Sequence, residues 1–411
     1  MIIIKAQKGT KDILPQEVEQ WQNLEAKALE VFSRAGFKEI RTPIFEATEL
    51  FARGVGDTTD IVNKEMYTFE KSERSLTLRP ENTAGVVRAY IENGMHRLSA
   101  PVKLWYKGPM FRYERPQAGR QRQFHQVGVE IFGISEPTAD AECILLALNY
   151  LKSIGLNDLD VEINSLGCVS CREGFSASLR SALKPNLDKM CPDCQSRYEK
   201  NPLRILDCKV PECQFILDNS AVQDVITSDY ICEDCQKHFD EVISYLDSLN
   251  IKYVRNRLLV RGLDYYNRTV FEIKSNNLGS QNAVCGGGRY DSLVKNLGGE
   301  DTPAVGWAMG LERLNSLLPQ LESKKLQAYV VSNSSLDAIK LVEELREHGI
   351  GVDFDFTNKK FTKQLEKASK VADFALILGE DEIKSNTISI KNLNISEQKT
   401  VARREIIDNL I

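Results

Sequence analysis

The sequence predicts an α+β protein with three parts: an antiparallel sheet flanked by helices, a helical cysteine-rich insertion, and a C-terminal α/β domain with a mixed sheet. Three observations support this prediction. The aromatic and alternating runs of residues 103–133 are typical of a β-hairpin. Eight cysteines occur in pairs between Cys168 and Cys235, where helical patterns replace strand patterns. From Ala328 onward, short apolar runs alternate with helical stretches, as in an α/β domain.

The composition is that of an ordinary soluble globular chain, and its length allows two or three domains. The chain has 411 residues, of which 42% are hydrophobic and 27% charged, with a formal net charge of −5. This negative net charge gives no sign of a broadly basic surface, so any RNA-binding site must be a local patch of positive charge. No run approaches the ~18 apolar residues that a membrane helix requires, and the first residues lack the pattern of a secretory signal. We therefore expect a cytoplasmic protein without a membrane partner.

The first part of the chain predicts a helix, an interrupted strand, and a strand followed by a second helix. After Leu14, apolar residues recur every three or four positions, which predicts an amphipathic helix packed on the core. Residues 36–46 read as a strand interrupted by a proline, and such strands lie at edges or interfaces. Residues 75–78 form a further strand, and a helix begins at Thr83 after a proline turn. Glu81 follows that strand, where it either faces a cleft or only places a charge at the helix start.

The predicted hairpin has a core face and a polar face. In its returning strand, Val127, Val129 and Ile131 fall on one face. Gln126, Gly128 and Glu130 fall on the other face, and the glycine would leave room for a ligand between its neighbours. A proline and a glycine mark the turn at residues 115–119. Four arginines near the tip are suited to grip phosphate, namely Arg112, Arg115, Arg120 and Arg122. The alternative is an exposed hairpin with a solvated polar face.

A helix is predicted over residues 138–154, and a helical insertion over residues 168–250. Because a secretory signal is lacking, metal binding or free thiols are favoured over disulfides in the insertion. The first two CxxC pairs are separated by nineteen residues, which fits a four-cysteine zinc site, and a second site can use the other four cysteines. The cysteines predicted to bind zinc are Cys168, Cys171, Cys191 and Cys194. The alternative is that these thiols only pack.

Three stretches after the insertion carry unusual residue combinations. The strand-like residues 258–272 contain Arg-Gly-Leu-Asp-Tyr-Tyr, which supplies one cation and two phenols, or else only an aromatic strand with salt bridges. Residues 285–291 include three consecutive glycines, which indicate a close approach of backbone or ligand. Residues 305–314 predict a strand that turns at Gly310 into a helix, with Arg313 in the first turn near backbone donors for anions. Neither a Rossmann nor a Walker pattern occurs.

The last part, residues 326–411, follows a predicted linker at residues 322–325 and predicts a small α/β domain. The expected strands span residues 328–331, 351–356, 374–378 and 387–390, and the expected helices residues 336–348, 361–369 and 403–410. Four lysines share one helical face, which either contacts phosphates or is simply solvated: Lys359, Lys363, Lys367 and Lys370.

Taken in order, these stretches resemble the motifs of the class II aminoacyl-tRNA synthetases, and of the histidyl-tRNA synthetases in particular. Residues 36–46 resemble motif 1, the Arg112 hairpin resembles motif 2, and residues 305–314 resemble motif 3. The Arg-Gly-Leu-Asp-Tyr-Tyr run and the triple glycine resemble the two histidine-specific motifs. The family often has glycine where Asn82 stands here. The resemblance implies a class II catalytic core in residues 1–320, interrupted by the insertion, an anticodon-binding domain in residues 326–411, and a homodimer.

The resemblance also implies a reaction and a set of roles. The enzyme would activate L-histidine with ATP and Mg²⁺, and then transfer the histidyl group to the 3′ end of tRNA(His). The implied catalytic residues are Arg112 and Arg261. The implied histidine-binding residues are Glu81, Thr83, Gln126, Glu130, Arg261, Tyr265, Tyr266 and Tyr290. ATP would contact Arg112, Glu114 and Arg313, and the tRNA acceptor end would contact Gln117, Arg120 and Arg122.

Two other functions compete with this interpretation. One is a non-catalytic histidine-binding paralogue that acts as a regulatory subunit of ATP phosphoribosyltransferase. Such a protein would need neither Arg261 nor the C-terminal domain, and both are present here. The other is a synthetase for a different amino acid, against which the Arg-Gly-Leu-Asp-Tyr-Tyr run argues.

Overall fold

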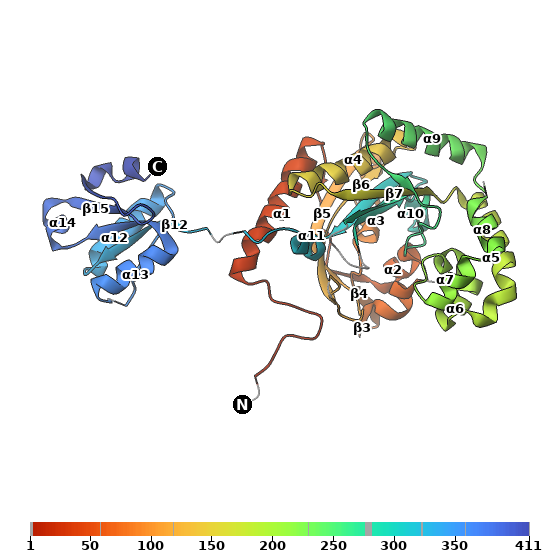
Figure 1. Ribbon diagram of the computed structural model, residues 1–411, viewed down its shortest axis with the longest axis horizontal. Coiled ribbons are helices and arrows are strands. Elements are labelled where there is room, and N and C mark those ends of the chain that lie inside the picture. The colour runs from red at the N-terminus through yellow and green to blue at the C-terminus, as the bar shows by residue number, and fades with distance from the viewer. Residues whose placement is uncertain are drawn as a thin grey trace. The chain divides into compact units, whose positions relative to one another are not determined.

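The structure is a computed structural model that describes residues 3–57, 59–117, 119–228, 230–275, 282–321, 324–357 and 359–410. The chain divides into two compact units, Met1–Gln320 and Leu321–Ile411, each of which is described by itself (Figure 1). The linker predicted at residues 322–325 lies partly outside the described residues, and so does Ala118 in the predicted hairpin turn.

An eight-stranded sheet forms the centre of the first unit. Its strands in spatial order are β1 (Lys38–Glu39), β5 (Val102–Phe111), β6 (Gln123–Phe132), β11 (Ala304–Gly310), β10 (Ala283–Arg289), β9 (Asn267–Ser275), β7 (Leu159–Ser165) and β8 (Val254–Arg255). The six inner strands are antiparallel, and only the two short edge strands pair in parallel. The predicted hairpin is confirmed, because β5 and β6 pair along their whole length, with Val102 opposite Phe132 and Phe111 opposite Gln123.

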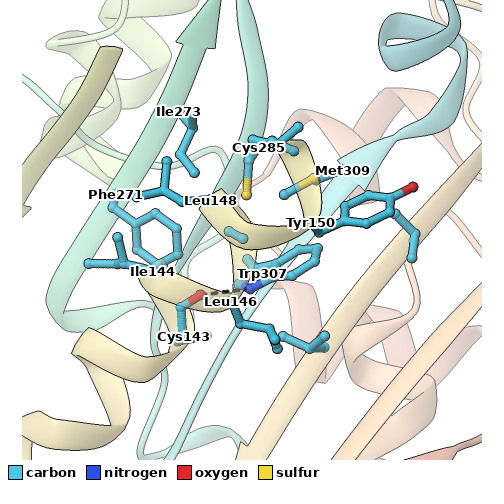
Figure 2. Close-up of a cluster of buried hydrophobic side chains, with 14 of the residues drawn as sticks. Cys143, Ile144, Leu146, Leu148, Tyr150, Phe271, Ile273, Cys285, Trp307 and Met309 are labelled. Atoms are coloured by element: carbon cyan, nitrogen blue, oxygen red, sulfur yellow. Dashed lines mark hydrogen bonds between the residues drawn. The ribbon is translucent and has the colours of Figure 1, made fainter. Parts of the chain in front are cut away.

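One face of this sheet is buried under helices α1 (Pro15–Arg34) and α4 (Pro137–Ser153). The predicted core face of β6 points into this layer, because Val127, Val129 and Ile131 belong to the same buried cluster as both helices. Figure 2 shows part of the cluster, in which residues of α4 pack against Phe271, Trp307 and other residues of β9, β10 and β11. The Trp307 indole donates a hydrogen bond of 2.9 Å to the backbone carbonyl of Cys143 on α4. Side chains of alternate residues must therefore face the opposite side of the sheet.

The opposite face is covered only in part. Helices α3 (Thr83–Glu92) and α10 (Leu293–Asn296) pack there around a cluster of buried tyrosines: Tyr90, Tyr106, Tyr265, Tyr266 and Tyr290. A three-stranded sheet lies in the same part of the chain, with the strand order β2 (Phe45–Ala47), β4 (Arg74–Leu78) and β3 (Tyr67–Lys71). Helix α2 (Thr48–Val55) and a π-helical turn (Ile61–Glu65) join β2 to β3. The helix predicted from Thr83 is confirmed.

The predicted helical insertion is also confirmed. Its helices are α5 (Val169–Leu183), α6 (Pro192–Lys200), α7 (Pro211–Leu217), α8 (Ser220–Thr227) and α9 (Glu233–Ser248). Figure 1 shows α5–α8 gathered as one lobe, from which α9 returns to α4. The lobe has a hydrophobic core of its own, which includes Phe175, Leu179 and Ile205. The α9 side chains Phe239, Val242 and Leu246 instead join the core of the main sheet.

A buried polar network fastens α9 to the main sheet. Asp140 on α4 is fully buried and accepts hydrogen bonds from Arg289 on β10 and from His238 on α9. Although burial opposes ionisation, the Arg289 guanidinium lowers the pKa of Asp140 below its ordinary value. Arg268 lies 3.0 Å from His238 Nδ1 and can only donate, so Nδ1 accepts and the Nε2 hydrogen points to Asp140. The His238 ring is therefore held between Asp140 on α4 and Arg268 on β9.

Residues 258–266 differ from the prediction. The strand begins only at Asn267, and the residues before it run as turns and irregular backbone. The reason is that this segment leaves the sheet plane: the Asp264 N–H donates to Val55 on α2, while the rings of Tyr265 and Tyr266 turn under the sheet into the tyrosine cluster. Aromatic residues favour strands, but here burial of the two rings decides the path.

The second unit is an α/β fold around a five-stranded mixed sheet. Its strands in spatial order are β13 (Val352–Phe354), β12 (Leu326–Ser332), β14 (Ala372–Leu378), β15 (Thr387–Asn392) and β16 (Gln398–Ala402), of which the first three are parallel. Its helices are α12 (Ser335–Glu347), α13 (Phe361–Val371) and α14 (Glu380–Ser385). The helix predicted over residues 403–410 is wrong, because two short 3₁₀ turns occur there after β16. Across the described residues of both units, no helix is long and apolar enough to cross a membrane.

Candidate active site

A cavity of about 780 Å³ opens on the partly covered face of the sheet. Strands β6, β7, β9, β10 and β11 provide its floor, the start of α3 one end, and the insertion one wall. Ten of the residues predicted to bind histidine, ATP or tRNA line this cavity: Glu81, Thr83, Arg112, Glu114, Arg120, Gln126, Arg261, Tyr265, Tyr266 and Arg313. The structure therefore gathers residues that lie up to 232 positions apart in the sequence (313 minus 81).

One end of the cavity is acidic and deeply buried. Glu81 accepts hydrogen bonds from the backbone N–H groups of Thr83 at 2.7 Å and Ala84 at 2.9 Å, at the start of α3. Burial raises the pKa of Glu81 above its ordinary value, although these two hydrogen bonds oppose the shift. The nearby side-chain carbonyl of Gln126 is buried without a hydrogen-bond partner among the described residues. This end of the cavity is therefore built to accept hydrogen bonds from a cationic or N–H-bearing group.

Glu130 lies beneath this end of the cavity and does not line it. The Tyr290 hydroxyl donates a hydrogen bond to its Oε2 atom, while Oε1 has no partner among the described residues. Burial raises the pKa of Glu130 to about 8, against the opposing effect of the Tyr290 hydrogen bond. Tyr290 does not line the cavity either, and the centroid of its ring lies 5.5 Å from the centroid of the Tyr265 ring. Both residues support the lining residues from a second layer.

The room predicted at Gly128 is not open to a ligand. A Cβ atom at this position would lie 2.5 Å from the ring and hydroxyl of Tyr106 on the neighbouring strand. The phenol of Tyr106 therefore occupies the space that the missing side chain leaves. That expectation is wrong because the sequence pattern does not show which neighbour fills a gap in a sheet.

The other end of the cavity is rich in arginine. The Arg112 Nε donates to the carbonyl of Pro80 at 2.8 Å, and its guanidinium lies over the Phe124 ring. Glu114 forms ion pairs with Arg112 at 3.8 Å and with Arg120 at 3.2 Å. Arg313, in the first turn of α11 (Leu311–Leu317) as predicted, donates to the carbonyl of Ala283 at 2.6 Å.

Electrostatics at this end favour an anion. Burial and the neighbouring cation of Arg120 lower the pKa of Arg313. Arginines crowded in this way repel one another until a negative ligand arrives between them. Their planar donors suit the oxygen atoms of phosphate groups.

Arg261 lies between the two ends and is held by its neighbours on the floor. Its Nη1 atom donates to Glu272 on β9, and its Nε atom has no partner in the described part of the chain. Although burial works against it, the Glu272 carboxylate raises the pKa of Arg261. Gly286 on β10 makes this position possible, because a Cβ atom there would lie 1.8 Å from Arg261 Nη2. The close approach expected at the triple glycine is thus made by an arginine side chain at this position.

Comparison with known proteins agrees with this geometry. A family model described as histidyl-tRNA synthetase matches residues 9–190 and 209–314, and one described as anticodon binding domain matches residues 327–411. The chain belongs to the histidyl-tRNA synthetase family. The resemblance seen in the sequence motifs is confirmed, and so is the class II type of fold.

Individual members of the family match over nearly the full length. The histidine–tRNA ligase of Desulfitobacterium hafniense is 48% identical over 405 residues, which cover 96% of this chain and 95% of that protein. The solved apo histidyl-tRNA synthetase of S. aureus matches with a TM-score of 0.82 and 36% identity, covering 99% of this chain and 100% of that chain. A structure from Bacillus halodurans C, named as an ATP phosphoribosyltransferase regulatory subunit/histidyl-tRNA synthetase, has a TM-score of 0.69 at 21% identity, with 92% of this chain and 99% of that chain covered. This last similarity concerns the fold alone.

In this family member, the insertion supplies one wall of the cavity, which sequence reasoning missed. The lining includes residues 206–210, which connect a 3₁₀ turn (Pro202–Ile205) to α7 without regular structure. Asp207 and Lys209 are exposed toward the cavity, whereas Leu206 and Cys208 are buried in the lobe. The sequence motifs gave no signal for this wall, because it depends on how the insertion folds back.

The eight insertion cysteines form two groups whose sulfur atoms lie within 4.8 Å of one another: Cys168, Cys171, Cys232 and Cys235 in the stem cluster, and Cys191, Cys194, Cys208 and Cys213 in the lobe cluster. The predicted grouping of Cys168 and Cys171 with Cys191 and Cys194 is therefore wrong. The 15 residues of α5 carry the chain about 22 Å away from the first pair. Helices α7 and α8 then lead the chain back, so that the last pair, at the start of α9, lies beside the first.

Of the three predicted tRNA contacts, only Arg120 lines the cavity. The Arg122 guanidinium instead stacks 4.0 Å from the Tyr113 ring centroid, and Gln117 forms an isolated bridge with Arg120. Conversely, Glu272 and Lys274 line the cavity but were not predicted. The sequence could have indicated them, because they alternate with apolar residues on β9, and charged residues at every second position of a strand share one face.

Proposed function

We propose that this chain is a histidine–tRNA ligase that forms histidyl-adenylate from L-histidine and ATP and then esterifies the 3′ end of tRNA(His). The observation that carries the proposal is the single cavity, in which an acidic end and an arginine-rich end meet at Arg261. The acidic end suits the amino group and ring of histidine, and the basic end suits the phosphates of ATP. The family match extends over both units of the chain, which supports an enzyme with an anticodon-binding domain over a regulatory paralogue.

In the proposed first step, a carboxylate oxygen of histidine attacks the α-phosphorus of ATP. The bond between that phosphorus and the oxygen that bridges to the β-phosphorus breaks, and pyrophosphate leaves with its Mg²⁺. Arg112 binds the α-phosphate, Arg261 bridges it to the histidine carboxylate, and Arg313 binds the γ-phosphate. Fixed cations placed where negative charge develops lower the barrier without reorganising during the reaction. Glu114 holds Arg112 and Arg120 in place for this task.

In the proposed second step, a hydroxyl of the terminal ribose of tRNA attacks the carbonyl carbon of histidyl-adenylate. The ester bond to the ribose forms, the bond to AMP breaks, and the hydroxyl proton passes to the departing phosphate or to solvent. Of the three residues expected at the acceptor end, Arg120 is proposed to contact it because it lines the cavity, whereas Arg122 and Gln117 do not line it.

Histidine selection is proposed to rest on the acidic end. Glu81, Thr83 and Gln126 hold the amino group and backbone, and Tyr265 and Tyr266 enclose the imidazole. Glu130 is proposed to read the imidazole from behind the lining residues through its Oε1 atom, while Tyr290 holds the Oε2 atom. The partnerless oxygen atoms of Gln126 and Glu130 support this assignment, because buried acceptors normally find a donor. A site that hydrogen-bonds its substrate rejects isosteres that lack those groups, so no editing domain is required.

The proposal is tested by ATP–pyrophosphate exchange with each of the twenty amino acids on the full chain. Exchange that depends on histidine, with little activity for the others, is the expected result. Tight histidine binding without exchange would instead identify a non-catalytic histidine-binding protein. Exchange with a different amino acid would overturn the histidine assignment.

The two cysteine clusters have groups suited to a metal, and Zn²⁺ is the proposed ion. Four thiolates around Zn²⁺ at about 2.3 Å place neighbouring sulfurs about 3.8 Å apart. The sulfur distances of 3.5 Å between Cys168 and Cys171 and 3.9 Å between Cys191 and Cys208 are close to this value. Both greatly exceed the ~2.05 Å of a disulfide, and all ten cysteines are free thiols in the structure.

Assembly and location complete the proposal. The homodimer is proposed because the segment with Pro43 leads into β2 and exposes the large apolar side chains of Ile44 and Phe45. Phe69 on β3, at the other edge of the same three-stranded sheet, is exposed as well. A second copy covering these side chains would bury them in an isologous interface. Sedimentation of a fully active monomer at micromolar concentration would refute this. The cytoplasm is the proposed compartment, since unpaired thiols persist in reducing surroundings.

A further inference from the structure

We infer that the two cysteine clusters are metal sites with different functions: the stem cluster fastens the insertion to the main sheet, and the lobe cluster holds the wall of the active-site cavity. The inference deepens the proposed function, because it rests on the cavity being the site of histidine activation. Zn²⁺ is the ion that both clusters would take, and each cysteine thiol releases its proton to solvent when it binds.

The stem cluster lies where the chain leaves the sheet and where it returns. Cys168 follows β7 after two residues and is the N-cap residue of α5, whereas Cys232 is the N-cap residue of α9. The two pairs touch directly, since the Cys232 N–H donates a hydrogen bond of 3.1 Å to the Cys171 sulfur. Gly167 allows this approach, because it has a φ of +70° and a Cβ atom there would lie 2.4 Å from the Cβ of Cys171. A metal bound here would link the two ends of the lobe to each other, and the stabilisation from such a cross-link is expected to be largest for long loops.

The lobe cluster lies beside the cavity. Two of its members, Cys191 and Cys208, are themselves among the lining residues. The Cys191 N–H donates a hydrogen bond of 3.2 Å to the Cys213 sulfur, so the start of α6 is joined to α7 across this cluster. Cys208 stands in the middle of the irregular wall segment, residues 206–210. Because this segment lacks a hydrogen-bond ladder, its position depends on how Cys208 is held.

The charges of the wall face the reacting groups of the floor. Asp207 and Lys209, which flank Cys208, line the same cavity as Arg261 and Glu272. The Lys209 charge is close enough to contribute to the lowered pKa of Glu162, although burial opposes the shift and Lys274 accounts for more of it. The wall therefore adds an ion pair to the cavity, in which Lys209 and Asp207 lie 3.0 Å apart, and the cation of this pair is the group proposed to reach a phosphate of ATP. Loss of the lobe metal should weaken ATP binding while the insertion stays attached through the stem cluster.

Contacts that involve neither cluster also join α6 to the core, so loss of the lobe metal need not detach the lobe. Asp60, before the π-helical turn, pairs with Arg197 at 2.8 Å and Arg204 at 3.4 Å, and Asn201 donates to Asp264 at 2.8 Å. These contacts come from α6 and the turn after it, not from the 206–210 wall. A lobe that has lost its metal therefore still has contacts that keep it on the core.

Metal content is measured first, on the full chain purified without chelator and again after exchange into Co²⁺. We expect two Zn²⁺ or two Co²⁺ per chain, with the visible absorption of tetrahedral cobalt thiolates. A wild-type chain that activates histidine yet holds no metal would overturn the inference and leave the proposed function intact. A wild-type chain that binds metal but does not activate histidine would instead remove the proposed function.

Two matched variants then separate the clusters from thiol loss in general. Cys194→Ala removes a fully buried sulfur from the lobe cluster, and Cys143→Ala removes an equally buried sulfur outside both clusters. Cys194→Ala should lower the metal content from two to one per chain and raise the KM for ATP in pyrophosphate exchange by about tenfold. Cys143→Ala should keep two metals and the wild-type KM. One metal with an unchanged KM for ATP would overturn the function assigned to the lobe cluster.

The stem cluster predicts a different result. Cys235→Ala should also leave one metal per chain, but it should increase protease cleavage across the junctions near residues 166 and 232, which Cys194→Ala should not do. The same cleavage pattern for both variants would contradict separate functions. If Cys194→Ala does not fold, Cys191→Ser serves as the second lobe variant, because Cys191 is only partly buried and a serine there is hydrated.

Discussion

The floor and the insertion wall of the cavity are built by different means. The floor consists of sheet strands, in which the backbone ladder fixes residues such as Glu130, and Tyr290 holds the Glu130 side chain. Arg261 comes from the irregular residues 258–266, but its guanidinium is held against this floor by Glu272 on β9 and lies over Gly286 on β10. The wall consists of residues 206–210, which have no ladder and depend on a sulfur cluster. The difference teaches that a group which must stabilise a transition state is held against rigid strands by its partners, even when, like Arg261, it comes from an irregular segment. A group that only helps to bind can lack such support.

The largest effect is expected for Arg261 on the floor. Arg261→Lys and Arg261→His should slow adenylate formation by about 10²–10³, because neither side chain bridges a carboxylate and a phosphate bidentately. Histidine KM should change little, since the lost interaction forms mainly in the transition state. Pyrophosphate exchange measures the loss, with the exposed Arg34→Lys on α1 as a matched control. A loss below tenfold would mean that Arg261 is not the principal cation of the step.

The second effect tests whether Arg261 requires the space that the missing side chain of Gly286 leaves. Gly286→Ala would place a Cβ atom 1.8 Å from the Arg261 guanidinium and push it from its position. Because a long side chain can move aside, stability should change by no more than about 1 kcal/mol, while activation falls by up to about 10². Gly174→Ala on α5 is the control, because a Cβ atom there meets nothing within 4 Å. Equal activity for the two variants would show that Arg261 tolerates displacement.

The third effect concerns the second layer below the floor. Glu130→Gln keeps the shape and removes the charge, so histidine binding should weaken by roughly tenfold while ATP affinity stays nearly unchanged. Isothermal titration with each ligand separately measures both. An equal loss for histidine and ATP would exclude Glu130 as a reader of the imidazole.

The same substitution makes a prediction about pH. The pKa of Glu130 in the folded protein is about 8, above its ordinary value of 4.5, because its carboxyl is buried. Between these two values the folded state binds more protons than the unfolded state, so the free energy of unfolding should fall as the pH rises through this window. Glu130→Gln removes the contribution of Glu130 to this pH dependence. The contribution of Glu81, whose pKa is also raised by burial, remains in both proteins. Urea unfolding at pH 5.5 and 8 should therefore show a smaller decrease in the free energy of unfolding for the variant than for the wild type. Identical decreases would contradict the raised pKa of Glu130.

The smallest effect distinguishes two arginines near the hairpin tip. Arg120→Ala should raise the KM for tRNA about two- to fivefold, as expected for a partly exposed charge. Arg122→Ala should leave it nearly unchanged, because its guanidinium stacks on Tyr113 and does not line the cavity. Steady-state aminoacylation compares them. A larger effect at Arg122 would restore it as a tRNA contact.

The sequence predicts those features of the fold and site that depend on residues close together along the chain. Strand alternation and helix periodicity are local, so the hairpin, α1, α3 and the helical insertion were all predicted. Contacts such as Tyr290 with Glu130, 160 positions apart, depend on strand order and are not visible in a local pattern. The cysteine grouping failed for the same reason, because α5 and α9 decide which pairs meet.

The turn at residues 258–266 and the wall at residues 206–210 show a second limit. Neither has regular structure, so no periodicity marks them, and yet both line the cavity. The motif resemblance located the first of these segments, because its residue types are unusual. It could not locate the second, where Asp207 and Lys209 are ordinary surface residues by type.

The most direct test of the central claim is a single-turnover measurement of both half-reactions with Arg261→Lys. If the floor residue Arg261 stabilises charge on the α-phosphate, adenylate formation should slow by about 10²–10³. Transfer from preformed histidyl-adenylate to tRNA should then stay close to the wild-type rate, because the α-phosphate has already reacted. A transfer rate that falls as far as the activation rate would contradict the account and make Arg261 a structural support of the cavity floor.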